Sequence, residues 1–440
     1  MKFFCTILVS LFMVISVAAQ SGHVMNGVGP IDQGMAGSGM AAPQDALTAL
    51  HWNPASILAL PGRSFDVGLQ LMMPTGSLSS TVQQGAFGPM GPAVTLTGTS
   101  DSDAGPFPVP SIGYIHNSPD KPYAWGISVF GVGGFGVDYE LSATNPLLTP
   151  QMPDGGMGFG AMSSTFMLMQ VSPTFAYQFN DAISIGIAPT INFASLELSV
   201  FPGTAPTVMG SMPDGTPLMK YPDAPADWAT GFGFQAGIQA DLTETVHLGL
   251  SYKSKQSFSD FEYDPELAGA ADFAFRLDYP MILSAGLAYT GLSGLNVAAD
   301  VRYIDFENTE GFDETGFDAT GAVKGFGWSS IVVASIGAQY DLTDDLTVRA
   351  GYGWNDSPID GAVAFYNSPA PALITNRVAG GVSYAISEKV LLSVAGQYGM
   401  KADVTGEWKN PMFPGGSNPF TSVTHELSTL TFIMGVHVSL

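Results

Sequence analysis

The sequence predicts an all-β protein, a transmembrane antiparallel β-barrel of about fourteen strands with a mostly helical hatch in its lumen. Three observations support this fold class. The chain is 46% hydrophobic and only 12% charged, with a mean hydropathy of +0.22. Beyond residue 20, no segment approaches the roughly 18 continuous apolar residues of a membrane helix. Apolar residues instead alternate with polar or small ones, as a strand with one face in lipid requires.

The first residues, 1–19, are predicted to be a secretory signal peptide. Lys2 supplies the positive charge, residues 3–17 form the apolar run, and Ala18 and Ala19 complete a small-residue cleavage site. A transmembrane anchor is disfavoured because the run is short and no stop-transfer charges follow. The only cysteine, Cys5, leaves with this peptide, so disulfides, zinc–thiolate sites and cysteine nucleophiles are excluded from the mature chain.

The net charge limits which classes of partner the chain could bind. Loss of Lys2 leaves 14 − 1 = 13 basic residues against 38 acidic ones, a formal net charge of 13 − 38 = −25. This argues against nucleic acid and anionic lipid surfaces as partners. Outer-membrane lipid and lipopolysaccharide are the expected surroundings.

Period-2 alternation is clearest in "DFAFRLDYPMILSAGLAY" (272–289), "TVHLGLSYK" (245–253) and "TVRAGYGW" (347–354), with Tyr or Trp near the end of each. Such runs are typical of lipid-facing strands with interfacial aromatics. Short polar turns alternate with long Gly/Pro/Asp-rich loops, at roughly 81–106, 139–163, 201–227, 257–271, 307–327, 357–372 and 403–424. This asymmetry indicates periplasmic turns and extracellular loops, and an even strand count puts both termini in the periplasm of a bacterial outer-membrane protein.

The last strand, "LTFIMGVHVSL", is expected to be read by the barrel assembly machinery. The spacing of Gly435, Val438 and Leu440 resembles the signal that this machinery recognises, although Leu stands where Phe is commonest. The sequence thus divides into the signal peptide, a hatch over 20–62, and a barrel over 63–440.

The hatch segment is rich in Gly, Ala and Met and too apolar to stay unburied, so its place is inside the barrel. Asn53 is a good N-cap and Pro54 suits the first helical position; Pro43 opens a second short helix upstream. The glycines of the third strand are the first candidates for the contact of "NPASILAL" with the wall.

The stretch "GMAGSGMAAPQDALTALHWNPASILAL" resembles the N-terminal hatch of the FadL family, outer-membrane channels for long-chain fatty acids and other hydrophobic molecules. The matching residues are Gly34, Gly37, Gly39, Asp45, Asn53, Pro54 and Ala55. Further matches, such as "LNVAADVRYIDFEN" and "LTVRAGYGWNDSPI", extend over nearly all of the mature chain. The resemblance implies fourteen strands, a hatch in the lumen, and a third strand that kinks inward to open a lateral exit.

The predicted third strand is "YAWGISVFGVGGFGVDY", and its glycines would form this kink: Gly131, Gly133, Gly134 and Gly136. Glycine inside a strand marks a bulge, a bend or a close backbone approach. The alternative is an ordinary glycine-rich lumen face, since 53 glycines are spread through the chain.

Four arginines point inward by alternation and are candidate ligands for a fatty carboxylate, which Arg binds in a bidentate fork: Arg276, Arg302, Arg349 and Arg377. The alternative is a set of charge pairs that ties the hatch to the wall through Asp32 or Asp45. Two Met-rich loops, "NPLLTPQMPDGGMGFGAM" and "FPGTAPTVMGSMPDGTPLM", suit a pliable hydrophobic capture site.

No catalytic residue, cofactor or metal site is predicted, and "GMAGSGM" lacks the G-x-S-x-G spacing of a lipase. The sequence therefore predicts a passive uptake channel for hydrophobic molecules, first of all long-chain fatty acids. The alternatives are a channel for aromatic hydrocarbons, a porin for polar solutes, and a structural barrel.

Overall fold

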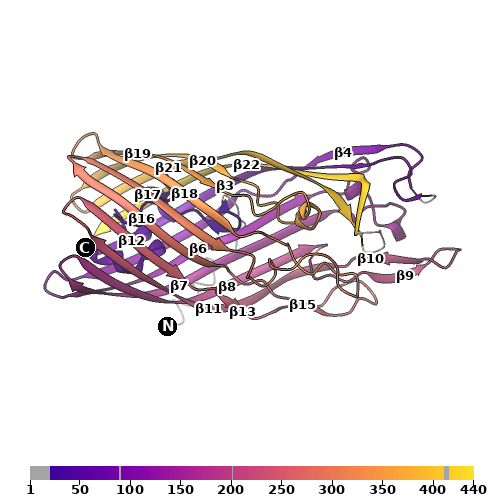
Figure 1. Cartoon of the computed structure of the whole chain (residues 1–440), viewed down its shortest axis with the longest axis horizontal. Coiled ribbons are helices and arrows are strands. Elements are labelled where there is room, and N and C mark those ends of the chain that lie inside the picture. The colour runs from indigo at the N-terminus through magenta and orange to yellow at the C-terminus, as the bar shows by residue number, and fades with distance from the viewer. Residues whose placement is uncertain (1–19, 89–90, 201, 411–415) are drawn as a thin grey trace.

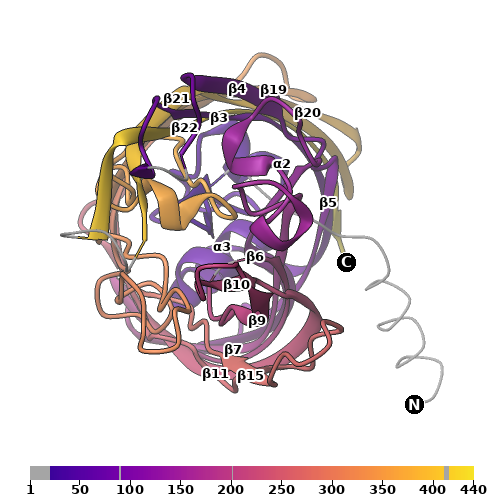
Figure 2. The ribbon, with the colours of Figure 1, turned by 90° about the vertical axis from the view of Figure 1, so that its right-hand side faces the viewer.

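The computed structural model describes residues 20–88, 91–200, 202–410 and 416–440; the predicted signal peptide lies outside these residues. The chain forms a closed antiparallel β-barrel whose strands run along the length of the molecule (Figure 1). Seen end-on, short helices lie inside the ring of strands (Figure 2). The predicted fold class is confirmed.

Fourteen strands build the wall within the described part of the chain, as predicted. In chain order they are β3 (Gly62–Val82), β5 (Phe107–Asn117), β6 (Tyr123–Tyr139), β7 (Met162–Asn180), β8 (Ile183–Ser199), β11 (Asp223–Asp241), β12 (Val246–Lys253), β16 (Met281–Leu292), β17 (Leu295–Asp305), β18 (Ile331–Asp341), β19 (Leu346–Asn355), β20 (Asn376–Ser387), β21 (Val390–Lys409) and β22 (Ser417–Ser439). Each pairs with the next in antiparallel register. β22 then pairs with β3, from Thr421↔Val82 to Ser439↔Ser64, and closes the barrel.

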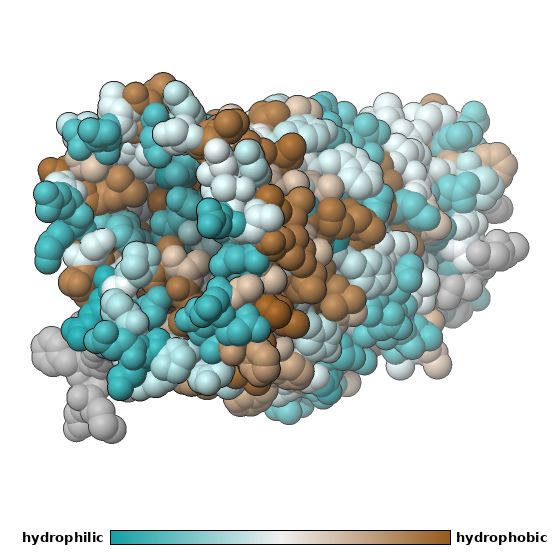
Figure 3. Space-filling view, turned by 60° about the vertical axis from the view of Figure 1, so that its left-hand side comes forward, coloured by the Kyte–Doolittle hydropathy of each residue, from teal (hydrophilic) through white to brown (hydrophobic). Residues whose placement is uncertain are grey.

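Alternation along the strands decides which side chains face outward. In β16, Leu283, Leu287 and Tyr289 are exposed, whereas Ile282 and Ala288 are buried. Apolar side chains gather over the wall, and hydrophilic ones lie toward both ends (Figure 3). A lipid-facing wall between two aqueous ends needs this distribution. Among the described residues, no helix is long and apolar enough to cross a membrane.

The strand expected to begin near Asp272 starts later. β15 (Phe273–Phe275) pairs with β14 (Phe261–Tyr263) in a separate two-stranded sheet, and β16 begins only at Met281. Tyr279 between them is 1% exposed. The alternation in this segment therefore continues past the end of the wall strand, because an inward-packed loop also buries its apolar residues.

Some expected loops contain strands. β22 begins at Ser417 instead of near His425. β4 (Leu96–Asp101) pairs with the far end of β3, and β9 (Thr207–Ser211) and β10 (Pro217–Lys220) form a hairpin. Gly and Pro mark turns in these segments, but they do not exclude short paired runs between the turns.

The residues ahead of the first wall strand form five short elements: β1 (Gln20–Ser21), β2 (Val24–Met25), α2 (Gly29–Gly34), α3 (Ala46–Trp52) and the 3₁₀ helix η1 (Pro54–Ala59). The structure thus adds α2 to the two helices expected. The helix expected at Pro43 begins at Ala46, because Asp45 caps it by accepting from the Thr48 N–H at 2.9 Å.

Loops cover the end of the barrel that faces the viewer in Figure 2. η3 (Pro146–Leu148) and η5 (Ala364–Asn367) lie there. Leu147, Leu148 and Phe365 are buried in one apolar cluster with Trp408. The lumen therefore lies between this apolar cover and the helices of the hatch.

Candidate functional site

Asn53 fixes one end of the hatch to the wall. It caps η1, since its side-chain oxygen accepts from the Ala55 N–H at 3.1 Å. Its amide nitrogen donates to the Ile238 carbonyl at 3.0 Å and to Gln239 Oε1 at 3.2 Å, both on β11. The predicted capping role of Asn53 is confirmed.

Two wall glycines make room for this motif. A Cβ at Gly186 of β8 would collide with the backbone of Pro54 and Ala55, and a Cβ at Gly237 of β11 would collide with Asn53. The expectation that "NPASILAL" contacts the glycines of the third strand is wrong for Asn53, Pro54 and Ala55, which lie against β8 and β11. Those glycines contact the first residues of the hatch instead. Close backbone approach needs a position without a Cβ, and β8 and β11 supply it.

The other hatch-motif glycines also lie at close approaches. A Cβ on Gly34 would be 3.3 Å from the Cα of Gly381 on β20. The N–H of Gly39 donates to Asp32 Oδ1 at 3.3 Å. The carbonyl of Gly37 accepts from Arg302.

A buried charge network ties the hatch to β17. Arg302 pairs with Asp300 at 2.7 Å, and its guanidinium lies 3.6 Å from the ring centroid of Trp52. Trp52 Nε1 in turn donates to Asp32 at 2.8 Å. Burial raises the pKa of Asp32 to about 7, and the nearby Arg302 cation offsets part of that effect. Arg302 therefore contacts the hatch directly. This agrees with the alternative in which the arginines tie the hatch to the wall near Asp32.

Two of the other candidate arginines are also engaged. Arg276 lies outside the wall strands, is 39% exposed at its side chain, and pairs with Asp278 at 3.1 Å. Arg349 is buried and donates to Gln339 at 2.7 Å and to Ser383 at 2.5 Å.

Arg377 is different, because within the described chain it has no carboxylate at salt-bridge distance. It is 1% exposed and donates to Asn355 at 2.9 Å and to the hydroxyl of Ser21 in the hatch at 3.4 Å. This cation therefore braces the first residues of the hatch through neutral groups alone.

The C-terminal half of β6, the predicted third strand, separates from its neighbour β5. Pairing with β5 ends at Ser111↔Phe130, whereas pairing with β7 continues to the end of β6. The register with β7 shifts between Gly131 and Gly133, and residues 130–135 are all buried instead of alternating. We call the space between residues 107–110 of β5 and 131–139 of β6 the wall gap.

The start of the hatch occupies the edge of β6 that β5 leaves free. Val24 of β2 pairs with Gly133, and the Gly134 N–H donates to the His23 carbonyl at 3.1 Å. A Cβ on Gly133 would lie 2.8 Å from that carbonyl oxygen, so a side chain there would displace β2.

Apolar side chains fill the wall gap. A Cβ at Gly131 would collide with the Val109 side chain, and a Cβ on Gly136 would lie 3.4 Å from the Phe107 ring. The buried cluster, which we call the gap cluster, joins one hatch residue to two wall strands: Met25, Met72, Phe107 and Val109.

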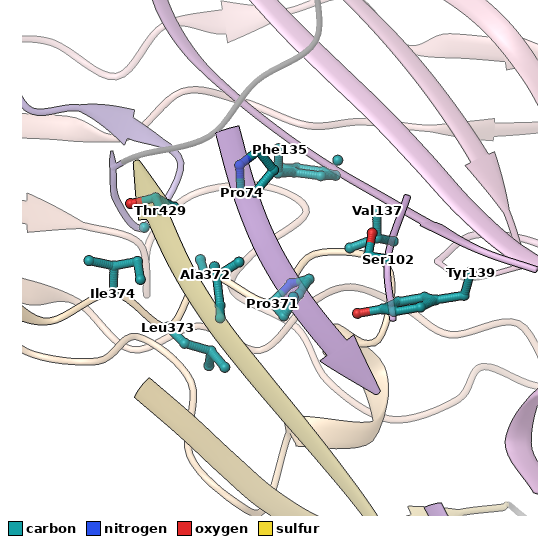
Figure 4. A pocket seen from close by; sticks show the side chains of 14 residues that line it. Pro74, Ser102, Phe135, Val137, Tyr139, Pro371, Ala372, Leu373, Ile374 and Thr429 are labelled. Carbon is teal, nitrogen blue, oxygen red and sulfur yellow. The ribbon is translucent and has the colours of Figure 1, made fainter. Parts of the chain in front are cut away.

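A pocket lies beside the C-terminal half of β6 (Figure 4); its empty volume is about 570 Å³, which includes space open to solvent. Among the described residues, its lining includes no charged side chain and consists mostly of apolar groups, such as Phe135, Val137, Pro371, Leu373, Ile374 and Leu427. Gly22 of the hatch lines it as well. In the described structure, the hydroxyls of Tyr139 and Thr429 in this lining have no hydrogen-bond partner.

His23 lies in a box of aromatic rings. Its imidazole stacks on Phe312 with centroids 4.8 Å apart, and the rings of Tyr279, Phe306 and Trp328 surround it. Burial lowers the pKa of His23 to about 3, so the ring is neutral. His23 could not be singled out from the sequence, because one histidine in a glycine-rich segment gives no signal of its surroundings.

The two Met-rich loops lie against each other. Lys220 pairs with Asp154 at 2.7 Å, and Gln151 exchanges two hydrogen bonds with the backbone of Tyr221. Met152 and Met209 are exposed on these loops.

Comparison with known proteins agrees with this architecture. A long-chain fatty acid transport protein of Escherichia coli O157:H7 is 22% identical over 401 residues, which are 80% of this chain and 82% of that protein. The Pseudomonas aeruginosa FadL homologue superposes with a TM-score of 0.71 at 15% identity, covering 95% of this chain and 99% of the other. The Pseudomonas putida toluene transporter TodX gives 0.67 at 19% identity, covering 94% and 99%.

The family model described as outer membrane protein transport protein (OMPP1/FadL/TodX) matches residues 11–436. The barrel, the helices in its lumen and this match agree. The chain belongs to the FadL/TodX family of outer-membrane transport proteins for hydrophobic compounds.

Proposed function

We propose that the chain is a passive channel for hydrophobic molecules, first of all long-chain fatty acids, which leave the lumen sideways into the membrane. One observation carries this proposal: β6 separates from β5 directly beside an apolar pocket. No energy source is assigned, so movement would follow the ligand gradient.

The ligand would first adsorb at the Met-rich loops, where Met152 and Met209 expose polarisable apolar groups. It would then pass the apolar cover of the mouth and enter the pocket. The lining favours a molecule that is largely apolar, because burial of a charge without a partner is strongly unfavourable.

The pocket and the wall gap are connected by four consecutive hatch residues. Gly22 lines the pocket, His23 and Val24 hold the free edge of β6, and Met25 belongs to the gap cluster. A ligand that displaces Gly22 would therefore also draw Met25 from the wall gap. This is the hatch rearrangement that lateral release requires.

Arg377 supports a fatty acid as the ligand. Its hydrogen-bond partner Ser21 directly precedes the pocket residue Gly22, and Arg377 holds no carboxylate of the described residues. A fatty carboxylate would compete with the Ser21 hydroxyl, because charge-assisted bonds to Arg are the stronger ones. Uptake of aromatic hydrocarbons is the second candidate, favoured by the uncharged lining and by the toluene transporters of similar fold.

Paired cysteines test the route, since no cysteine remains after the predicted cleavage. In Met25→Cys/Val109→Cys, a short bis-maleimide would join the hatch to β5 within the gap cluster. We expect the joined protein to lose uptake of radiolabelled oleate by cells. The control is Leu287→Cys/Ala299→Cys, register partners on β16 and β17, which should keep uptake when joined.

Oleate uptake at the wild-type rate by the joined hatch–wall pair would refute lateral release. Toluene uptake by the same cells decides between the two ligand classes. A large ion conductance in planar bilayers would instead favour a porin for polar solutes.

A further inference from the structure

Lys253 is a buried cation at the end of β12, on the inner face of the wall. It is 4% exposed, and its Nζ donates to Gln170 Oε1 of β7 at 3.2 Å. Gln170 is the register partner of Phe130, where the pairing of β6 with β5 ends. The Lys253 side chain therefore reaches across to the level at which the wall gap begins.

No carboxylate of the described residues lies within salt-bridge distance of Lys253. The buried Arg302, by contrast, has Asp300 at 2.7 Å. A buried charge is costly unless it is paired, so an ammonium that holds one neutral acceptor retains donor capacity for an anion.

Two further groups near Lys253 have unused hydrogen-bonding capacity. The ring of Tyr279 lies 5.9 Å from the Lys253 Nζ, and its hydroxyl has no partner in the described part of the chain. His51 of α3 is 2% exposed, and neither ring nitrogen has a partner there.

His51 stays neutral in this position. Burial, together with the nearby Lys253 and Arg302 cations, holds the pKa of His51 well below its usual range. A neutral imidazole carries one N–H, so His51 can donate one hydrogen bond to an anion. The ring also lies 5.8 Å from that of Phe130, which places it near the same end of the β5–β6 pairing.

We propose that Lys253, His51 and Tyr279 form a receptor for one carboxylate of an amphiphile that leaves the lumen through the wall gap. A carboxylate oxygen takes the place of the Gln170 amide oxygen on Lys253, and the imidazole N–H and the tyrosyl O–H donate to the carboxylate. The tail then points toward the gap while the head group is held. This inference rests on the proposed lateral route and names the ligand class as carboxylated.

The test compares oleate with methyl oleate, the methyl ester, which keeps the same tail and has no charged carboxylate. Binding of each is measured by titration calorimetry on purified barrel in detergent. For Lys253→Met we expect oleate affinity to fall about ten- to a hundredfold, because a hydrogen-bonded charge pair is lost. Methyl oleate affinity should not change, and Lys253→Arg should keep most of the oleate affinity.

Lys255→Met is the matched control, since this lysine is exposed two residues further on, and it should bind both ligands like the wild type. Folding of each variant is checked by heat-modifiability on gels. Removal of an unpaired buried charge is often neutral or stabilising, so Lys253→Met should fold.

Unchanged oleate affinity in Lys253→Met would overturn the receptor while the channel stands. Equal loss of both ligands would also overturn it, because Lys253 would then act only on the structure. If the wild-type barrel binds neither ligand and cells take up neither, the proposed function itself fails.

Discussion

Replacement of Asn53 by alanine should loosen the hatch without opening the barrel. The change removes the cap on the Ala55 N–H and the two donations to Ile238 and Gln239. Loss of an N-cap costs about 1 kcal/mol, and each lost buried hydrogen bond about 0.5–1 kcal/mol. The sum is about 2–3 kcal/mol, so local opening of η1 should become roughly 30- to 150-fold more frequent.

Hydrogen exchange with mass spectrometry in nanodiscs measures this opening. Peptides that cover residues 46–60 should lose protection by about that factor, while wall peptides stay unchanged. Asn53→Asp keeps the cap acceptor but turns a carboxylate oxygen toward the two acceptors on β11, so its protection should be no higher than that of Asn53→Ala. Asn180→Ala, which removes a similar cap in an exposed turn, is the control. Unchanged exchange over 46–60 in Asn53→Ala would show that Asn53 does not hold η1 against the wall.

Three further predictions use the same measurement. Gly237→Val should displace the hatch and speed exchange over 46–60, whereas Gly396→Val should not, because a Cβ there has its nearest neighbour at 3.9 Å. Arg302→Lys keeps the charge but loses the planar contact with Trp52, so the hatch should lose about 1–2 kcal/mol of protection. The folded-state pKa of Asp32, about 7, exceeds the ordinary value of an aspartate. The stability that protonated Asp32 gives the folded hatch is therefore fully present below about pH 4 and is lost as pH rises toward 7. Protection of α2, corrected for intrinsic exchange, should fall over that range, and Asp32→Asn should abolish the fall.

Alternation predicted the wall well because one face of each strand meets lipid. It placed Leu283, Leu287 and Tyr289 on the outward face, where the structure has them exposed. The same rule misplaced the start of β16, since Tyr279 in the preceding loop packs inward and continues the pattern. A periodic pattern reports burial, and burial does not distinguish a wall strand from a packed loop.

The site was harder to predict because it depends on contacts between distant segments. The capping of η1 by Asn53 involves neighbouring residues only, so it could be predicted from the sequence. The contact of this motif with Gly186 and Gly237 depends on the register of the barrel strands. Alternation in "TVHLGLSYK" puts Lys253 on the inner face, yet nothing in the sequence shows that it lacks a carboxylate partner among the described residues. That absence emerges only when fourteen wall strands and the hatch are placed around one lumen.

The position of the hatch ahead of the first wall strand has a consequence for biogenesis. α2 lies against the seam, since a Cβ on Gly435 of β22 would lie 2.9 Å from Pro30. β22 is synthesised last, and its pairing with β3 completes the cylinder. The seam therefore reaches its final packing against α2 only when the N-terminal segment is inside. Closure of the cylinder and placement of the first residues of the hatch are thus coupled parts of the assembly of this barrel.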